Sequence, residues 1–258
     1  MNKQVDLNAD MGESFGPWVM GQDEALLDIV TSANIACGFH AGDPDVMART
    51  MKAANERGVG IGAHPGFADL QGFGRRRMQL SAESLGNVVK YQVGAAQAMA
   101  RAIGGQLQHL KLHGAMANMA AEDKDMALTC YRAALSVAPE ITVMVLAGTA
   151  QQTAAEEIGC KLAREIFADR AYNDDATLVD RKLPGAVIHD ADRAATRMVE
   201  MVQAGAIITE SGKKIPTPID TICLHGDTPE AVKIAQSVRR ALEEDGILVR
   251  RFGGSTTT

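Results

Sequence analysis

The sequence has 258 residues, of which 46% are hydrophobic, 22% charged and 4% aromatic, with a formal net charge of −6. The length suits one large α/β domain or two small ones. A chain of this size can bury a hydrophobic core without disulfide bonds or a structural metal. The acidic balance argues against nucleic acid as a partner, and the few aromatic rings argue against a surface that stacks bases or sugars. No apolar run approaches the roughly 18 residues of a membrane span. The polar N-terminus lacks a signal-peptide pattern, so we expect a cytoplasmic protein with no membrane partner.

Short β-rich runs alternate with longer helical patterns along the chain. The predicted strands are 5–8, 33–39, 59–63, 107–112, 142–146, 162–167, 219–224 and 247–251. The predicted helices are 43–57, 81–104, 122–137, 149–159, 190–204 and 228–245. Strand–helix alternation on this scale predicts βαβ units, which form a parallel sheet in either a barrel or a doubly wound fold. Seven or eight units in this length favour the α/β fold of a (β/α) barrel with about seven parallel strands.

One segment breaks this alternation. Residues 206–216 contain a glycine turn between two short β-rich runs, which predicts a hairpin outside the barrel. No linker or shift of composition interrupts residues 1–252, so we expect one barrel domain there and a flexible tail at 253–258.

Four histidines occupy equivalent positions, each after an apolar strand pattern with Gly or Pro within two residues. They are His40, His64, His113 and His225. The carboxyl ends of parallel strands lie on one face of the fold, where active sites form, so the four imidazoles are expected to converge. The remaining two are interpreted as structural, because His109 lies inside a strand run and His189 precedes a helix start.

Carboxylates and cations accompany the histidines. Alternation along the first strand places Asp6, Asn8 and Asp10 on one side, and either function or burial as a satisfied carboxylate fits Asp6. The catalytic candidates are Asp10, His64, Lys111, His113 and Asp227. The substrate-binding candidates are Asp6, Asn8, Glu13, His40, Glu165, Arg170, Tyr172 and His225.

Two mechanisms fit these residue types. In the first, Asp10, His40 and His64 bind a divalent metal ion that activates water. In the second, a carboxylate takes a proton from water while Lys111 or a histidine stabilises the oxyanion, without a metal. No close H-x-x-x-H pair is present, so the sequence leaves both mechanisms open.

A run of three arginines follows a Gly-Phe-Gly segment. Arg75, Arg76 and Arg77 fit either a solvated charge run or a loop that binds phosphate. The chain contains no G-x-x-x-x-G-K-[ST] loop, no G-x-G-x-x-G after the first strand and no G-x-S-x-G elbow. A self-contained P-loop ATPase, a Rossmann dehydrogenase and an α/β-hydrolase are therefore disfavoured.

Several multi-residue motifs resemble one known family in the same order. They are the stretches at 6–16, 34–44, 62–67, 111–115, 165–172 and 224–227, with sequences such as DLNADMGE, NIACGFHAGDP and EIFADRAY. These stretches are similar to the LamB/YcsF family, and the similarity extends from residue 5 to about residue 252.

The resemblance implies an ATP-dependent cyclic-amide hydrolase that opens the lactam of 5-oxo-L-proline to L-glutamate. It also implies that this chain acts together with two partner chains, 5-oxoprolinase subunits B and C. It leaves open which of the chains binds ATP. It also implies a barrel similar to that of glycoside hydrolases and polysaccharide deacetylases. The related deacetylases use Asp and His at strand ends, which keeps a divalent metal in consideration.

Two other functions compete with this interpretation. A stand-alone metal-dependent hydrolase or deacetylase of the same fold would need no ATP. The other is a non-catalytic module that binds carbohydrate or regulates a partner. The low aromatic content speaks against it, because sugar-binding modules usually stack sugars on aromatic rings.

Overall fold

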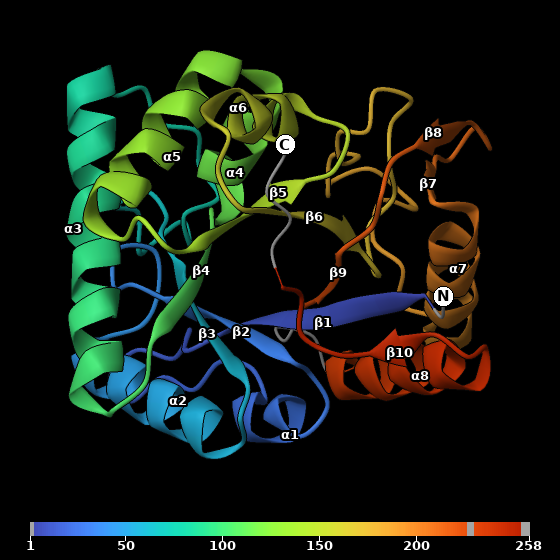
Figure 1. Ribbon diagram of the computed structural model, residues 1–258, viewed down its shortest axis with the longest axis horizontal. Helices are drawn as coiled ribbons and strands as arrows, with labels where there is room; N and C mark the ends of the chain where they lie inside the picture. Colours follow the sequence, from blue (N-terminus) through green and yellow to red (C-terminus); the bar gives the residue numbers. More distant parts are fainter. Residues whose placement is uncertain (1–2, 226–229, 254–258) are drawn as a thin grey trace.

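The computed structural model describes residues 3–225 and 230–253, and a closed ring of parallel strands lies at its centre (Figure 1). The strands follow in the order β1-β2-β3-β4-β5-β6-β9, and β1 closes the ring by pairing with β9. Their bounds are β1 Gln4–Met11, β2 Ser32–Ala36, β3 Gly60–His64, β4 Leu107–Lys111, β5 Thr142–Leu146, β6 Leu162–Phe167 and β9 Thr221–Leu224. The predicted (β/α) barrel of about seven parallel strands is confirmed.

Three short strands lie outside this ring. β10, Leu248–Val249, pairs in parallel with the first residues of β1. β7, Ala206–Ile208, and β8, Lys214–Pro216, form an antiparallel pair of their own. The hairpin predicted for residues 206–216 is therefore present and separate from the barrel sheet.

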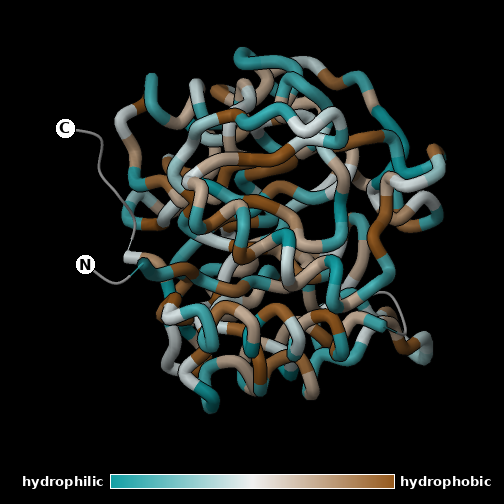
Figure 2. Tube along the Cα trace, turned by 90° about the vertical axis from the view of Figure 1, so that its right-hand side faces the viewer, coloured by the Kyte–Doolittle hydropathy of each residue, from teal (hydrophilic) through white to brown (hydrophobic). Residues whose placement is uncertain are grey.

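Helices surround the ring. Their bounds are α1 Asp23–Leu27, α2 Pro44–Glu56, α3 Ala82–Ala102, α4 Gly114–Glu122, α5 Lys124–Val137, α6 Ala150–Ile158, α7 Ala191–Ala204 and α8 Ala231–Glu244. α3 packs on α5, and α7 packs on α8. Brown and teal alternate along the coils at the lower edge of Figure 2, as expected for helices with one buried side. Among the described residues, no helix is both long enough and apolar enough to cross a bilayer.

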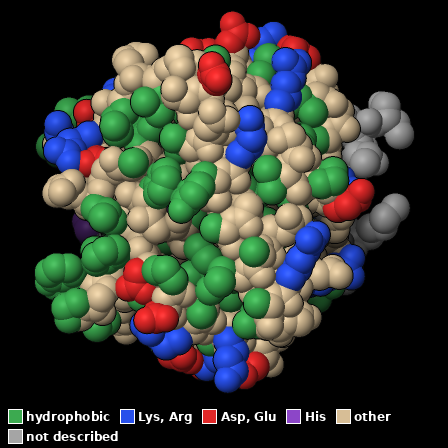
Figure 3. Space-filling view, turned by 90° about the vertical axis from the view of Figure 1, so that its left-hand side faces the viewer, with side chains coloured by type: hydrophobic (Ala, Val, Ile, Leu, Met, Phe, Trp, Pro, Cys, Tyr) green, Lys and Arg blue, Asp and Glu red, His purple; other side chains and the backbone are tan. Residues whose placement is uncertain are grey.

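The outer surface is mixed in character. Figure 3 shows the side of the molecule that lies at the left of Figure 1, where α3 runs, with hydrophobic side chains scattered among charged ones. Tyr91 of α3 is exposed and stacks on Phe39. Most of the apolar side chains are instead buried between the helices and the ring of strands.

One predicted strand is too long, and one helix was not predicted. The strand predicted for 33–39 ends at Ala36, because the chain turns through Gly38 and Gly42 at positive φ, and this loop carries His40. The helix predicted for 122–137 is present as α5, which begins at Lys124 after the Asp123 cap, whereas α4, Gly114–Glu122, precedes it and was not predicted. α4 has no polar cap at its start and its sequence is rich in Ala and Met, so it lacked a start signal.

Candidate active site

The carboxyl ends of the barrel strands open into a cavity of about 770 Å³. Pockets for small ligands generally lie between about 300 and 1,000 Å³. The predicted site residues that line it are Asp10, Glu13, His64, Arg75, Arg76, Arg77, Lys111, His113, Arg170 and His225. Seven of its described lining residues are Lys or Arg and four are Asp or Glu, so the cavity favours anions although the whole chain is acidic.

Polar side chains fill the barrel in layers below this cavity. At the lowest, Asp6 is fully buried and accepts hydrogen bonds from the hydroxyls of Thr31, Ser32 and Thr221 at 2.5–2.7 Å. Burial raises the pKa of Asp6 to about 6, although these hydrogen bonds oppose the shift. Asp6 does not line this cavity, and its carboxylate is instead held by hydroxyl groups below it.

The middle layer joins side chains from β1, β2 and β4. Asn34 on β2 donates to Asn8 Oδ1 at 2.7 Å, and its own Oδ1 lies 2.8 Å from Nε2 of His109 on β4. The His109 ring crosses over β3, where a Cβ on Gly62 would come within 2.0 Å of Nε2. A glycine on β3 thus leaves the space that the imidazole fills, and burial lowers the pKa of His109 to about 3.

The upper layer, on the cavity floor, is built around Lys111. Its Nζ lies 2.9 Å from Asp10 Oδ1, 2.9 Å from Glu165 Oε1 and 3.0 Å from Cys223 Sγ. A lysine ammonium has three donors, and here three acceptors surround it. The arrangement therefore suits Lys111 for holding the carboxylates in place, with no donor left over for a substrate oxyanion.

The charges of this layer shift one another's protonation. Burial raises the pKa of Asp10, but the charges of His64 and Lys111 outweigh it and hold the pKa well below its usual range. Burial lowers the pKa of Lys111, but Asp10, Cys223 and Glu165 outweigh it and hold that pKa well above its usual range. For Glu165, burial dominates and raises the pKa. Asp10 is consequently an ionised acceptor at neutral pH, with Oδ1 bonded to Lys111 and Oδ2 3.4 Å from His64 Nε2.

His64, His113 and His40 form one cluster, called here the histidine cluster. His64 Nδ1 lies 2.8 Å from the carbonyl oxygen of Lys111, and His113 Nε2 lies 2.7 Å from the carbonyl oxygen of Phe73. The remaining nitrogens, His64 Nε2 and His113 Nδ1, are 3.0 Å apart. Burial lowers the pKa of His113 to about 3, which favours its neutral form.

His40 completes the cluster by stacking on His113, with ring centroids 3.7 Å apart and planes 7° apart. Glycines make room for it: a Cβ on Gly66 would lie 2.7 Å from His40 Nδ1, and one on Gly74 would lie 2.7 Å from His40 Cβ. Both ring nitrogens of His40 are buried and find no hydrogen-bond partner among the described residues. An unpartnered buried polar group costs about 1–3 kcal/mol, so this side chain is the least satisfied member of the site.

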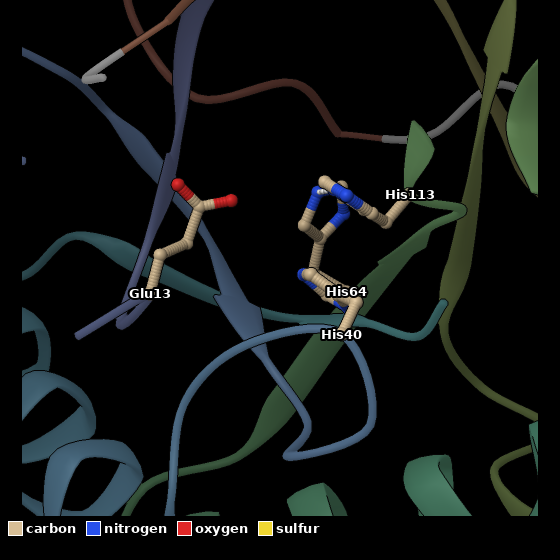
Figure 4. Close-up of side chains that lie close together, drawn as sticks. All are labelled: Glu13, His40, His64 and His113. Atoms are coloured by element: carbon tan, nitrogen blue, oxygen red, sulfur yellow. Dashed lines mark hydrogen bonds between the residues drawn. The ribbon is translucent and has the colours of Figure 1, made fainter. Parts of the chain in front are cut away.

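Among the described residues, two groups of side chains could hold a metal ion. Glu13 joins His40, His64 and His113, with one ligand atom from each inside a 4.8 Å limit, and Asp10 joins Cys223 and His225 within the same limit. Figure 4 shows the Glu13 carboxylate facing His64 and His113 across an open space. The predicted ligands Asp10, His40 and His64 are thus divided between the two groups, although His64 Nε2 lies only 3.4 Å from Asp10 Oδ2.

His225 lies on the other side of Asp10 from the histidine cluster and belongs to a separate arrangement. Its Nδ1 is 2.7 Å from Asp169 Oδ2, and its ring stacks on Phe167. Burial raises the pKa of Asp169, but the charge of His225 outweighs it and lowers that pKa. Tyr172 does not reach the cavity, since its hydroxyl accepts the N–H of Phe167 at 2.7 Å inside the core.

The three arginines of the predicted phosphate loop have different surroundings. Arg76 pairs with Asp69, and Arg77 pairs with Glu122 at 2.7 Å near the surface. The Arg75 guanidinium lies over the Phe73 ring, 4.8 Å from its centroid. Arg75 is also the member of the run whose charge lowers the pKa values of His40 and His113, so it is directed towards the cluster.

Some residues of the site were not among the predicted ones. Asn34, Cys223 and Asp169 contact His109, Lys111 and His225 respectively. Strand alternation could have found Cys223, because it lies opposite Asn8 in the pairing of β9 with β1. The predicted catalytic Asp227 lies outside the described residues, and so does most of the predicted tail.

The chain is similar to several known proteins over nearly its whole length. The A subunit of 5-oxoprolinase from Ruegeria pomeroyi is 69% identical over 249 residues, which are 96% of this chain and 98% of that protein. The crystal structure of a lactam utilization protein from Thermus thermophilus is 41% identical, with a TM-score of 0.90 over 96% of this chain and 100% of that one. A structure described as a putative cellobiose-phosphate cleavage protein, from Enterococcus faecalis, is only 18% identical over 97% of this chain and 98% of that one; its TM-score of 0.56 shows a shared fold alone. Residues 5–257 match the LamB/YcsF family, and the chain belongs to that family.

Proposed function

We propose that this chain is the barrel component, known as the A subunit, of an ATP-dependent 5-oxoprolinase, which opens the lactam of 5-oxo-L-proline to L-glutamate. The observation that carries the proposal is the 69% identity, over nearly the whole of both chains, to a protein named as the A subunit of 5-oxoprolinase. A hydrolase of cyclic amides is also in keeping with the lactam utilization protein that shares the fold at a TM-score of 0.90.

The chemistry of the cavity supports an anionic substrate and an anionic cosubstrate. Both 5-oxoproline, through its carboxylate, and ATP, through its phosphates, need cations, and Arg75, Arg170, Arg181 and Lys182 all line the cavity. The cavity of about 770 Å³ exceeds what a five-membered ring with one carboxylate fills, so there is room for a second ligand.

ATP would activate the lactam for attack by water. An unstrained lactam is a poor electrophile. Transfer of the γ-phosphoryl group to the lactam oxygen releases ADP and makes a phosphorylated imidate. Water then adds at that carbon and the C–N bond breaks as the nitrogen takes a proton, which leaves an acyl phosphate. A second water hydrolyses the acyl phosphate and phosphate leaves, so that glutamate, ADP and phosphate are formed from 5-oxoproline, ATP and two water molecules.

Asp10 is the group we assign to the water in this reaction. Asp10 lines the cavity, and Lys111 and Asn34 hold its Oδ1 at 2.9 Å each. An ionised carboxylate with a lowered pKa is a weak base. It suffices to orient water towards an already activated carbon, and Lys111 acts as the positioning residue behind it.

The word subunit in the relatives' names supports partner chains, and we propose 5-oxoprolinase subunits B and C. The test is glutamate formation from 5-oxoproline and ATP by this chain alone, by B and C together, and by all three. Glutamate from the mixture of all three only would support the proposal. Calorimetric titration of the isolated chain with ATP then tells whether the nucleotide site lies on this chain or requires a partner.

The competing function, a stand-alone metal-dependent hydrolase, predicts a different result in the same assay. It requires turnover of acetylated or glycosidic substrates without ATP, and loss of that turnover on adding a chelator. Such activity by the isolated chain, with no glutamate from the mixture, would replace the proposal.

A further inference from the structure

One wall of the cavity is formed by the long connection between β6 and α7. It spans residues 168–190, and residues 177–182 of it line the cavity. An antiparallel bridge joins Arg170 to Val187, so the connection is folded back on itself. Connections longer than about 12–15 residues in a compact domain usually have a function of their own. A connection of this length, folded against the cavity, is suited to bind part of a ligand.

Arg170 on this connection is a buried cation without a carboxylate partner. It lines the cavity but is only 5% exposed, and its Nη2 donates to the carbonyl oxygen of Val179 at 2.6 Å. Among residues 3–225 and 230–253, its Nε has no hydrogen-bond partner and no carboxylate oxygen lies within 4.0 Å of its guanidinium. Burial and the charge of Arg181 lower the pKa of Arg170 to about 10. A buried charge is costly unless it is paired, so a bound anion would stabilise this side chain.

Arg181 brings a second guanidinium to the same wall, and it too forms no ion pair within the described part of the chain. Asp169 is the acid whose charge acts on Arg170. Both oxygens of Asp169 already lie 2.7–2.8 Å from His225 Nδ1. Together the two arginines and Asp169 carry one net positive charge, which a singly charged anionic group would neutralise.

Two other arginines of the cavity lining have their charges compensated. Arg76 pairs with Asp69, and Arg77 pairs with Glu122. The guanidiniums that are left for an anion are therefore those of the β6–α7 connection.

This wall lies beside the group that we assign to the water. Arg181 Nη2 is 3.4 Å from His225 Nε2, and a ring nitrogen of His225 lies within 4.8 Å of a carboxylate oxygen of Asp10. In 5-oxoproline, only the ring nitrogen separates the lactam carbon from the carbon that bears the carboxylate. A carboxylate held at Arg181 would therefore keep the lactam carbon close to water at Asp10.

We propose that Arg170 and Arg181 bind the carboxylate of the substrate, and that they thereby select lactams with a carboxylate beside the ring nitrogen over neutral lactams. The identity of this anion rests on the proposed function. A guanidinium presents N–H donors in a planar fork that matches the two oxygens of a carboxylate. A neutral lactam is rejected because it would leave both cations of the wall without a counterion.

The test compares three probes: 5-oxoproline, the neutral lactam 2-pyrrolidinone, and a non-hydrolysable ATP analogue. Each is titrated by calorimetry into the mixture of this chain with subunits B and C, and both lactams are also titrated with the ATP analogue present. The variants are Arg181→Gln and Arg170→Lys, which keeps the charge but loses the planar fork. Arg132→Gln is the matched control, because it removes a guanidinium from the exposed side of α5, away from the cavity.

We expect the parent to bind 5-oxoproline at least about tenfold more tightly than 2-pyrrolidinone, since hydrogen bonds to charged groups contribute about 1.5–3 kcal/mol. Arg181→Gln should weaken 5-oxoproline at least about tenfold and leave 2-pyrrolidinone unchanged, so that the preference is lost. Arg170→Lys should weaken 5-oxoproline in the same selective way. Arg132→Gln should bind all three probes like the parent. A thermal melt shows whether each variant is folded, and Arg181→Gln decides the matter if buried Arg170 does not tolerate lysine.

The proposal is overturned if the parent binds both lactams equally or binds neither. It is overturned as well if folded Arg181→Gln binds 5-oxoproline like Arg132→Gln, or if it weakens only the ATP analogue, which would assign the wall to a phosphate group. Glutamate formation separates this site from the reaction. Selective binding that depends on Arg181, with no glutamate from the mixture, would contradict the proposed function and leave the carboxylate site standing. Glutamate formed with an unchanged Michaelis constant for 5-oxoproline in Arg181→Gln would do the reverse.

Discussion

Lys111 and Asp10 form an ion pair inside the barrel, with Nζ 2.9 Å from Oδ1 and with both side chains nearly inaccessible to solvent. Glu165 lies at the same distance from Nζ on the opposite side. One ammonium therefore neutralises two buried carboxylates that come from different strands. The pair links the stability of the barrel to the protonation of the group we assign to the water.

Lys111→Met should destabilise the protein by about 3–5 kcal/mol, because it leaves two buried carboxylates without a counterion. Urea unfolding measures this loss, and glutamate formation by the mixture of all three chains should fall with it. Adding Glu165→Gln to Lys111→Met removes one uncompensated charge and should restore part of the stability. Lys52→Met, on the exposed side of α2, is the control. Parent-like stability and activity of Lys111→Met would contradict the assigned role.

Gly62 and His109 should behave as a coupled pair. Gly62→Ala places a Cβ within 2.0 Å of His109 Nε2, and overpacking of this kind typically costs about 1–3 kcal/mol, or more where backbone must move. Unfolding free energies of the two single variants and of Gly62→Ala with His109→Ala form a double-mutant cycle. The double variant should be more stable than the sum of the single losses allows. Simple additivity would show that the two positions do not share the space inside the barrel.

The sequence predicted side-chain positions correctly where strand periodicity determines them. Alternation along β1 correctly placed Asp6, Asn8 and Asp10 together inside the barrel, and strand ends brought His64, His113 and His225 to one mouth. The alternation could not predict how far below the cavity each of these side chains lies. Asp6, four residues before Asp10 on β1, ends in a layer below the cavity among hydroxyl donors that come from other elements.

Loop conformations and cross-strand contacts could not be predicted from the sequence, for a physical reason. His40 lies on a loop that leaves β2 early through Gly38 and Gly42, and its stacking on His113 depends on room left by Gly66 and Gly74. Such room depends on the relative positions of segments far apart in the chain. The same holds for the carbonyl oxygens that fix the ring orientations of His64 and His113.

Asp6→Asn should change how stability depends on pH. Burial raises the pKa of Asp6 to about 6 in the folded protein from 3.8. A raised carboxyl pKa means that its favourable contribution is present below about pH 4 and is lost as the pH rises through 6. The unfolding free energy of the parent should therefore fall relative to that of Asp6→Asn by up to about 3 kcal/mol between pH 4 and pH 7.

Urea unfolding of both proteins across this range measures the difference, in which the contributions of the other titrating groups largely cancel. The Michaelis constant of the three-chain mixture for 5-oxoproline should stay within about twofold, because Asp6 does not line the cavity. A pH-independent difference in stability, together with a raised Michaelis constant, would instead place Asp6 at the substrate.

Arg75 and Arg77 provide a matched test of the predicted phosphate loop. The charge of Arg75 is directed towards the histidine cluster, whereas Arg77 pairs with Glu122 where both side chains are about half exposed or more. Surface pairs of that kind contribute about 0–1 kcal/mol. In the three-chain mixture, Arg75→Gln should raise the Michaelis constant for ATP or 5-oxoproline about tenfold or more, with little change in kcat, because it removes a charge that contacts an anion. Arg77→Gln should change both constants less than about twofold, and equal effects of the two substitutions would show that the loop acts only through its total charge.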